Sequence, residues 1–266
     1  MAVKQAAAAA NHDLGLLDDE RYGAIRTACE EIRAGALVDQ FVVDVIQGGA
    51  GTSTNMNANE VIANRALELM GHVKGDYHVL HPNEHVNMSQ STNDVYPTPV
   101  KDAIILETHA ARGDRAVAGV LQSQGRRVPR RAEDGTHPAA GRGAHALEQE
   151  FGTYAQMLGE DRARMSEAVL LLHEINLGAA AIGTMLKAPE GYVESACGHL
   201  AEITGLPLDS AVDLIEATQD CGSFVQLSGT CHATLWLDGD SYYPVCQLTN
   251  KWINWHRVLQ RLVFED

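Results

Sequence analysis

The spacing of apolar residues limits the fold of this chain more than any other feature of its sequence. Between residues 16 and 32, and again between residues 61 and 70, apolar side chains recur three or four positions apart, and Gly71 follows the second run. This spacing places them on one face of an α-helix, whereas a half-buried strand would alternate every second residue. The candidate core positions in these two helices are Leu16, Leu17, Ile25, Cys29, Ile32, Val61, Ile62, Ala66, Leu67 and Met70.

Three further helices are predicted in the second half of the chain. The pattern indicates a long helix over residues 147–177 and shorter helices over residues 192–203 and 210–218. Gly205 and Pro207 separate the two short helices, since both residue types end helices. No convincing series of strands is present, so the predicted fold class is mostly α. The candidate core positions of the long helix are Phe151, Tyr154, Leu158, Met165, Val169 and Leu172.

Length, composition and charge favour a globular chain and exclude polyanionic partners. The chain has 266 residues, of which 45% are apolar, so it can bury a substantial core. Its formal net charge of −15 would be repelled by the phosphates of nucleic acid and by an anionic membrane surface. We therefore predict no nucleic-acid partner and no membrane partner.

The cysteines and the first residues indicate the compartment. Five cysteines are present, an odd number, and no two of them form a Cys-x-x-Cys pair that could hold zinc or exchange disulfides. Residues 1–11 carry one lysine and a run of alanines, which is too short and too weakly apolar for a signal peptide or a membrane span. Both observations predict reduced thiols and a cytoplasmic protein.

A first polar cluster runs from Gln47 to Asn57 and contains three glycines ahead of a predicted helix. Glycines let the backbone approach a ligand closely, and the N–H groups at a helix start attract a carboxylate or a phosphate. The cluster lacks the lysine of a P-loop and the preceding strand of a dinucleotide-binding fingerprint. Taken by itself, it favours a glycine turn with an asparagine helix cap.

A second polar cluster runs from His81 to Asp94. Its hydroxyl and amide groups could supply several donors to a small dicarboxylate without adding positive charge. The competing interpretation is a capped turn, because Ser, Thr, Asn and Asp also begin helices. The spacing of His81 and His85 would suit a metal ion, but Pro82 disturbs the helix there, and no metal site is predicted. Two such clusters in one chain favour the functional interpretation.

Seven segments of the sequence, three of them in or beside the two clusters, match the motifs of a known family. They are Asp39–Asp44, Gly48–Leu69, Val86–Pro97, Glu174–Ala179, Gly183–Thr184, Glu202–Gly205 and Glu216–Thr218. They resemble the aspartate ammonia-lyase (aspartase) branch of the aspartase/fumarase superfamily. Fumarases are similar but typically have Gly-Ser-Gly-Thr-Gln-Ser-Asn and Ser-Ser-Asn-Asp where this chain reads Gly-Ala-Gly-Thr-Ser-Thr-Asn and Ser-Thr-Asn-Asp. The similarity covers residues 4–108 and 147–229.

The resemblance implies a long-helix bundle of the aspartase/fumarase type with a smaller N-terminal domain of helices and loops, incomplete in this chain. On that basis residues 1–93 form part of the N-terminal domain, residues 94–229 form part of the bundle, and residues 230–266 are an unrecognised tail. The resemblance also implies anti elimination of ammonia from L-aspartate to give fumarate, in which donors around one carboxylate stabilise a dianion. By motif match the substrate-binding residues are Thr52, Ser91, Thr92 and Asn93, and a weaker match to a secondary anion site of fumarases involves His81, Asn83 and Glu84.

The resemblance further sets expectations about cofactors and partners. No organic cofactor is required, and a divalent cation fits as an activator. The substrate is a small dicarboxylate, L-aspartate or fumarate, and family members are homotetramers whose active sites draw on three chains. Two alternatives stay open, namely a fumarate hydratase-like lyase and a non-enzymatic helical remnant that binds a dicarboxylate weakly or only oligomerises.

The stretch from about residue 109 to residue 146 departs from its surroundings. Residues 109–145 hold seven of the fifteen arginines, three acids and a single leucine, which is typical of a disordered linker. With suitable codons, however, a one-base shift over residues 133–145 gives Lys-Met-Gly-Arg-Thr-Gln-Leu-Gln-Asp-Ala-Val-Pro. In the family, a Gly-Arg-Thr-(His or Gln)-Leu-Gln-Asp-Ala segment completes the carboxylate pocket. We therefore interpret this stretch as a reading-frame slip, and its lack of an apolar stripe argues against tetramer assembly.

The loop that carries the catalytic base in the family is not found in this sequence. In the family it reads Gly-Ser-Ser-x-Met-Pro-x-Lys-x-Asn, and neither Ser228 nor Ser241 has such a context. No catalytic residue is therefore assigned, and no activity above background is expected of this chain. Beyond Gly229 no recognisable string follows, although all three tryptophans lie there.

Overall fold

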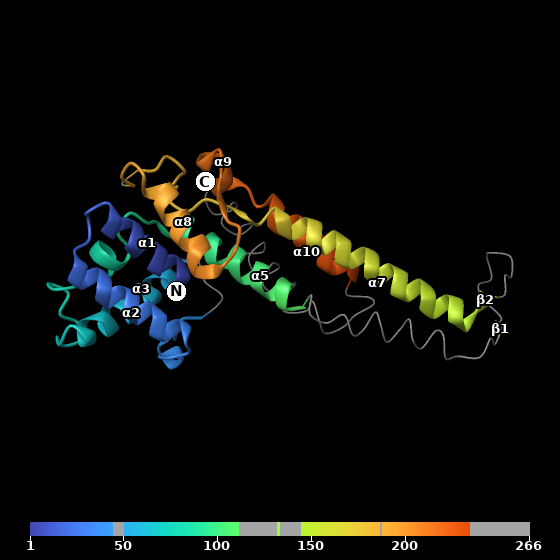
Figure 1. Cartoon of the computed structure of the whole chain (residues 1–266), viewed down its shortest axis with the longest axis horizontal. Coiled ribbons are helices and arrows are strands. Elements are labelled where there is room, and N and C mark those ends of the chain that lie inside the picture. The colour runs from blue at the N-terminus through green and yellow to red at the C-terminus, as the bar shows by residue number, and fades with distance from the viewer. Residues whose placement is uncertain (45–50, 112–131, 134–144, 187, 235–266) are drawn as a thin grey trace, which may run out of the picture. The chain divides into compact units, whose positions relative to one another are not determined.

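The computed structural model of the protein describes residues 1–44, 51–111, 132–133, 145–186 and 188–234 (Figure 1). Within these ranges the chain is mostly α, which confirms the predicted fold class. The strands found there have two residues each and form two small pairs. β1 (Ala132–Glu133) pairs antiparallel with β2 (His145–Ala146), and β3 (Glu174–Ile175) pairs parallel with β4 (Asp209–Ser210).

The described residues group into two compact units. The first contains Met1–Ala103 and Leu172–Gly222, and the second contains Ile104–Leu171 together with the described residues from Ser223 onward. All residues of the predicted substrate and anion sites belong to the first unit. The domain boundary between residues 93 and 94 remains a prediction.

Three helices build the core of the first unit: α1 (Ala2–Asp13), α2 (Asp19–Arg33) and α3 (Thr52–Leu69). α2 begins after Asp18, whose carboxylate accepts a hydrogen bond from the backbone N–H of Arg21 and so satisfies one free donor of the helix start. α3 ends ahead of Gly71, which takes the left-handed conformation at φ +82°. The cluster packed between these helices consists of Ala8, Leu17, Ala24, Ile25, Ala28, Cys29, Ile32, Ile62, Ala63, Ala66, Leu67, Leu80 and Val86.

Shorter elements complete the first unit and position the polar clusters. α1 packs against α8 as well as α2, and α3 packs against η2 and α4. The helix α5 begins in the first unit and continues into the second. The bounds are η1 (Val38–Gln40), η2 (Pro82–Val86, a π-helical turn), α4 (Thr92–Val95), α5 (Pro97–Ala111), α8 (Tyr192–Thr204) and α9 (Leu214–Gln219).

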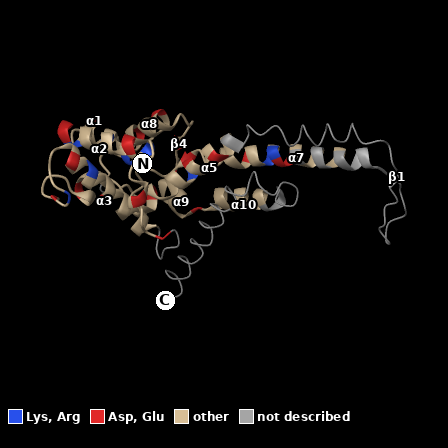
Figure 2. Ribbon diagram, turned by 90° about the horizontal axis from the view of Figure 1, so that it is seen from below, with Lys and Arg blue, Asp and Glu red and all other residues tan. Residues whose placement is uncertain are grey.

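The second unit contains α7 (Leu147–Leu170) and most of α10 (Gly222–Thr234). α7 carries charges of both signs, whereas α10 contains no Lys, Arg, Asp or Glu (Figure 2). α10 buries Phe224, Leu227 and Cys231 along one side and exposes Val225 and Gln226. The buried apolar residues of this unit are Ile104, Ile105, Met165, Ala168, Val169, Phe224, Leu227 and Cys231.

Two predicted helix boundaries are wrong. The helix expected over residues 147–177 ends at Leu170, because the carbonyls of His173 and Ile175 accept hydrogen bonds from the N–H groups of Asp209 and Ala211. The helix expected from residue 210 begins at Leu214, where the Asp213 carboxylate caps its first N–H groups. By contrast, the helix predicted over residues 192–203 is confirmed by α8.

Most predicted core positions are buried. Leu16 is an exception at 49% exposed, because it lies in the turn after α1 and not on a helix. Val61 and Met70 are only partly buried, and the side chains of Phe151, Tyr154 and Leu158 lie outside the described residues. The confirmed positions are Leu17, Ile25, Cys29, Ile32, Ile62, Ala66, Leu67, Met165, Val169 and Leu172.

The described cysteines form no disulfide with one another, in agreement with the predicted reduced thiols: Cys29, Cys197, Cys221 and Cys231. Cys246 lies outside the described residues. Among the helices that the structure describes, none is both long enough and apolar enough to cross a membrane.

Candidate functional site

Residues 91–95 form a capped helical turn. Ser91 is the N-cap of α4, and its hydroxyl oxygen accepts a hydrogen bond from the N–H of Asn93. In return, the N–H of Ser91 donates to Asp94 Oδ1 at 2.9 Å. This reciprocal pair is a capping box, which satisfies free backbone donors at a helix start. The capped-turn interpretation of the second cluster is therefore confirmed, and the turn holds its hydroxyl groups in defined places.

Asp94 connects this turn to a loop that follows it by 84 residues. Its other oxygen, Oδ2, accepts hydrogen bonds from the N–H groups of Gly178 at 3.1 Å and Ala180 at 3.0 Å. The side chain is fully buried, and burial raises the pKa of Asp94 to about 6 against the opposing effects of its backbone donors and of the Lys4 charge. The position of the turn is thus fixed by backbone groups from a distant part of the chain.

Two asparagine side chains add further links to the same loop. Asn93 Nδ2 donates to the carbonyl of Ala181 at 2.6 Å. Asn176, which is buried, donates through Nδ2 to the carbonyl of Asn93 and to Thr218 Oγ1, both at 3.2 Å. Residues 176–181 therefore support the Ser91–Asn93 segment by side chains as well as by backbone.

The start of α3 lies beside the end of α4. Gly51 is the N-cap of α3 at φ +80°, and a Cβ at this position would lie 2.6 Å from the ring of Tyr96. Only glycine fits such a conformation and such a close approach. Thr52 is therefore the first residue of α3, with an exposed side chain. The interpretation of an asparagine cap is wrong, because Gly51 occupies that position.

Buried amides join the starts of the two helices. Asn55 lies in the first turn of α3, and its Nδ2 donates to Thr92 Oγ1 and to Asn87 Oδ1, both at 3.2 Å. Asn59, one turn later, donates to the same Asn87 Oδ1 at 3.3 Å. Both α3 asparagines are buried. The helix that begins at Thr52 is thereby tied to the turn that carries Thr92.

Lys4 supplies a buried cation behind these amides. Its Nζ donates to Asn87 Oδ1 at 2.7 Å and to Gln90 Oε1 at 2.9 Å. Burial lowers the pKa of Lys4 to about 7, while the nearby Asp94 charge opposes that shift. Its two acceptors are neutral amide oxygens, so Lys4 orients amide groups, and it makes no direct ion pair with the residues that the structure describes.

The His81 turn is organised separately. His81 is the N-cap of η2, and its Nδ1 accepts hydrogen bonds from the N–H groups of Asn83 at 3.1 Å and Glu84 at 3.3 Å. The N–H of His81 in turn donates to His85 Nδ1 at 2.8 Å, and burial lowers the pKa of His85. The backbone donors of this turn have acceptors within the turn itself, and the secondary anion site at His81, Asn83 and Glu84 stays a prediction. Among the described residues, no three His, Cys, Asp or Glu side chains are grouped so that they could hold a metal ion.

The structure brings the four predicted substrate-binding residues into one region. Ser91, Thr92 and Asn93 share a single turn, and Thr52 begins the helix that Asn55 connects to it. Hydroxyl groups, an amide and the free N–H groups of a helix start all donate hydrogen bonds and suit a carboxylate. The functional role of these residues stays a prediction.

Residue-by-residue motif matching missed the supports of this region. Asp94 and Asn87 lie inside the recognised strings, but their sequence context does not show that they are buried or what they contact. Asn55 could have been found, because it follows Thr52 by three residues and so shares its face of the helix. Lys4 and Asn176 carry no local signal, since their partners lie 83 residues away.

The helical fold, the start of α3 at Thr52 and the Ser91–Asn93 turn together define a class of protein. A sequence model of the family described as lyase matches residues 1–111 and 144–236. The chain belongs to that lyase family, within the aspartase/fumarase superfamily. The match leaves out residues 112–143, which fall inside the anomalous stretch, and residues 237–266.

Curated relatives make the assignment more specific. The chain is 49% identical over 246 residues to the aspartate ammonia-lyase of Pseudomonas aeruginosa, an alignment that covers 87% of this chain and 49% of the relative. It is 44% identical over 229 residues to that of Bacillus subtilis and 43% identical over 236 residues to that of Escherichia coli, covering 86% and 85% of this chain and 48% of each relative. The chain spans about half the length of these relatives.

Solved structures agree with the fold. A crystal structure of a fumarate lyase:delta crystallin from Brucella melitensis, bound to cobalt, matches with a TM-score of 0.82 at 46% identity, over 86% of this chain and 50% of that one. A class II fumarase from Schistosoma mansoni also matches with a TM-score of 0.82, at 27% identity, over 89% of this chain and 53% of that one.

Proposed function

We propose that this chain is part of an aspartate ammonia-lyase, which in complete form converts L-aspartate to fumarate and ammonia by anti elimination. The observation that carries the proposal is the Ser91–Asn93 turn, which Asp94 and Asn55 hold beside the start of α3. We assign Thr52, Ser91, Thr92 and Asn93 to one side of a pocket for a dicarboxylate. The 43–49% identity to proteins named aspartate ammonia-lyase supports the same substrate class.

The chemistry of elimination explains why such residues are suitable. A carbon next to a carboxylate gives up a proton only if the resulting dianion is stabilised by donors that are already in place. Hydroxyl and amide N–H groups on a turn with a capping box are such donors, because their backbone does not need to reorganise. The base that takes the proton belongs to the loop that this sequence lacks, so we expect no fumarate formation from L-aspartate by the 266-residue chain. Fumarate production above background would contradict this expectation.

Further properties of the complete protein follow from the same proposal. It would be a cytoplasmic homotetramer that needs no organic cofactor and accepts a divalent cation as an activator. The frame slip over residues 109–146 also remains our proposal, and sequencing the DNA tests it. If no one-base shift in the real codons recovers the Gly-Arg-Thr segment, the slip is wrong.

Binding of succinate, an unreactive dicarboxylate, tests the proposed site without requiring catalysis. We expect saturable binding to the full chain by calorimetry, and we expect Thr92→Val to weaken it by about tenfold through loss of a hydrogen bond to a charged group. Thr27→Val is the matched control, because the Thr27 hydroxyl donates to the carbonyl of Gly23 on α2. If the unmodified chain does not bind succinate, the non-enzymatic remnant becomes the better description.

A fumarate hydratase-like activity is the second candidate. The observation in its favour is the equal TM-score of 0.82 to the class II fumarase, despite the lower sequence identity. Both activities can be assayed with a protein in which residues 109–146 are restored to the family sequence and the chain is extended to the length of its relatives. Ammonia release from L-aspartate supports the first candidate, whereas hydration of fumarate without ammonia release supports the second.

A further inference from the structure

We propose that Asn55 is a positioning residue, which directs the hydroxyl hydrogen of Thr92 toward a bound carboxylate. The inference rests on the proposed function, because it concerns the same dicarboxylate site. Asn55 is 5% exposed and donates to Thr92 Oγ1 from the first turn of α3. It would act through Thr92 and would not itself touch the ligand.

The orientation of the Asn55 amide is determined by a short series of hydrogen bonds. In its charged form Lys4 carries only donors, so the oxygen of the Asn87 amide faces it, at 2.7 Å. The Asn87 nitrogen correspondingly donates to the carbonyl of Gln90 at 3.2 Å, which fixes the amide from its other end. Because Asn87 Oδ1 also faces Asn55, the Asn55 amide must present its NH₂ group there.

The NH₂ group of Asn55 then has one hydrogen for each of two acceptors. One points to Asn87 Oδ1 and the other points to Thr92 Oγ1. Asn55 Nδ2 cannot accept a hydrogen bond, so the Thr92 hydroxyl cannot donate in return. Among the described residues, Thr92 Oγ1 has no acceptor for its own hydrogen.

The opposite orientation of the Asn55 amide would have the opposite effect. Its oxygen would face Thr92 and would accept the hydroxyl hydrogen, leaving only lone pairs for a ligand. Two lone pairs repel a carboxylate, whereas an O–H donates to it. The Lys4–Asn87–Asn55 series therefore decides whether Thr92 is a donor or an acceptor toward the pocket.

Replacement of Asn55 by an isosteric acceptor tests this directly. In Asn55→Asp, a carboxylate oxygen takes the place of Nδ2 and accepts the Thr92 hydrogen, so we expect succinate affinity of the full chain to fall by about thirtyfold. Asn59→Asp is the matched control, because Asn59 is also buried and also donates to Asn87 but makes no contact with Thr92. It adds the same charge one turn away, and we expect a loss of about threefold or less.

A second comparison separates positioning from a merely structural role. In a Thr92→Val background the hydroxyl is absent, so Asn55→Asp should reduce succinate affinity no more than Asn59→Asp does. Thermal unfolding confirms that each variant is folded. If Asn55→Asp does not fold, Asn55→Ala replaces it and should weaken binding by about fivefold, while Asn59→Ala should weaken it by about twofold or less.

The outcomes distinguish the inference from the function on which it rests. Equal losses in Asn55→Asp and Asn59→Asp, or a loss that persists in the Thr92→Val background, would overturn the positioning role alone. Absence of succinate binding by the unmodified chain would overturn the dicarboxylate site and the positioning role together. Binding that depends on Asn55 only when Thr92 is present supports both.

Discussion

Asp94 and Asp102 are two buried carboxylates on neighbouring helices, and their surroundings differ completely. Asp94 accepts hydrogen bonds from the N–H groups of Ser91, Gly178 and Ala180. Asp102 is only 5% exposed, yet neither of its carboxylate oxygens has a hydrogen-bond partner in the described part of the chain. Burial raises the pKa of both groups, to about 6 for Asp94 and to about 7 for Asp102.

The difference separates a carboxylate that organises a site from one that only lies in the interior. The cost of burying Asp94 is offset by three backbone donors, which also connect the α4 turn to residues 176–181. For Asp102 the opposing effect on the pKa comes from the amino group of Met1 alone. Burial and a raised pKa therefore do not identify a functional residue, whereas its hydrogen-bond partners do.

Asp94→Ala should produce the largest effect in this comparison. It leaves the N–H groups of Ser91, Gly178 and Ala180 without their acceptor, and each unsatisfied buried donor is costly. We expect the free energy of unfolding to fall by roughly 4 kcal/mol or more, measured by urea denaturation, and succinate binding to be lost. The comparison between the two aspartates would be wrong if Asp94→Ala and Asp102→Ala destabilised the protein equally.

Asp102→Asn should produce the second-largest change in unfolding free energy, and this change should depend on pH. The folded-state pKa of about 7 lies above the ordinary value of 3.8, so the folded state holds the Asp102 proton more tightly than the unfolded state does. Stability is therefore lost as pH rises from about 4 to about 7 and changes little beyond. Relative to the unmodified protein, Asp102→Asn should gain roughly 3 to 4 kcal/mol between pH 4 and pH 8.

The measurement for Asp102 is urea denaturation of both proteins across this pH range. Asp94 also loses stability as pH rises, between about pH 4 and 6, because its pKa is raised as well. That contribution is common to both proteins and cancels in their difference. A difference that stayed constant with pH would mean that Asp102 is already partnered or hydrated in the folded protein.

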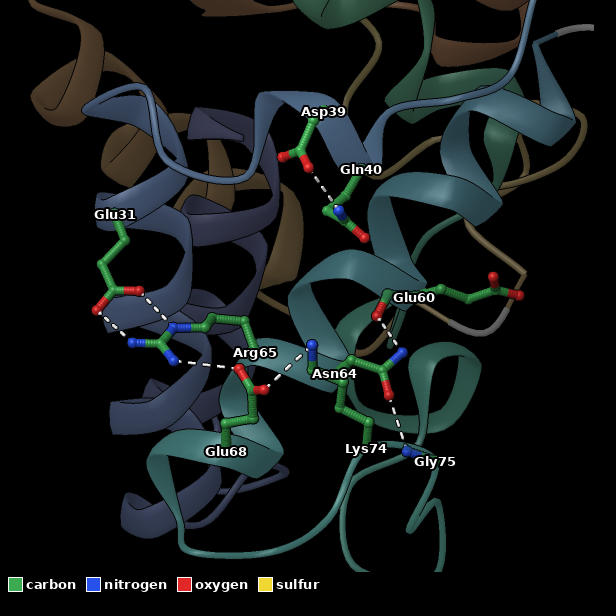
Figure 3. A network of polar contacts seen from close by, with 9 residues as sticks. All are labelled: Glu31, Asp39, Gln40, Glu60, Asn64, Arg65, Glu68, Lys74 and Gly75. Carbon is green, nitrogen blue, oxygen red and sulfur yellow. Dashed lines mark hydrogen bonds and ion pairs between the residues drawn. The ribbon is translucent and has the colours of Figure 1, made fainter.

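Asn176→Ala tests the other side of the Asp94 connection. Asn176 donates to the carbonyl of Asn93 and to Thr218 Oγ1, so its loss should cost roughly 1 to 2 kcal/mol of unfolding free energy. Asn64→Ala is the control, because Asn64 on α3 makes two exposed links, to the carbonyl of Glu60 and the N–H of Gly75 (Figure 3), and one part-buried link, to Tyr77 Oη. If Asn64→Ala lowered the unfolding free energy as much as Asn176→Ala, burial of the Asn176 hydrogen bonds would not explain their contribution.

Much of the helical architecture could be predicted from local spacing alone. Ile25, Cys29, Ile62 and Leu67 recur at helical intervals and are all buried. The predicted helix over residues 147–177 was wrong after Leu170. The residues that follow form a buried strand and loop. In sequence, a short buried apolar run of this kind cannot be told from a buried helix. The pairing of that strand with residues 209–210 is nonlocal, so no nearby spacing indicates it.

The proposed substrate-binding residues could be predicted from the sequence. The buried residues that hold them in place could not. Thr52 and the Ser91–Asn93 segment could be matched to a known pattern because they lie within two continuous strings. Asp94 and Lys4 act across more than 80 residues of sequence, and a single sequence does not show which distant backbone donor or amide completes a buried polar group. Such partners are set by the packing of helices, which local propensity does not determine.

Glu31 provides a third kind of carboxylate and the smallest expected effect. It is 34% exposed and accepts two hydrogen bonds from Arg65, which also pairs with Glu68 (Figure 3). The hydrogen bonds from Arg65 lower the pKa of Glu31, so its contribution is present above the ordinary value of 4.5 and is lost as pH falls through the folded-state pKa. Glu31→Gln should cost about 0.5 kcal/mol at pH 7 and less at high salt, because water and ions screen an exposed pair.

Glu60→Gln on α3 is the control, since the Glu60 side chain makes no ion pair among the described residues. If the loss of unfolding free energy in Glu31→Gln did not diminish with salt, the Glu31–Arg65 pair would behave like Asp94, which depends on buried partners.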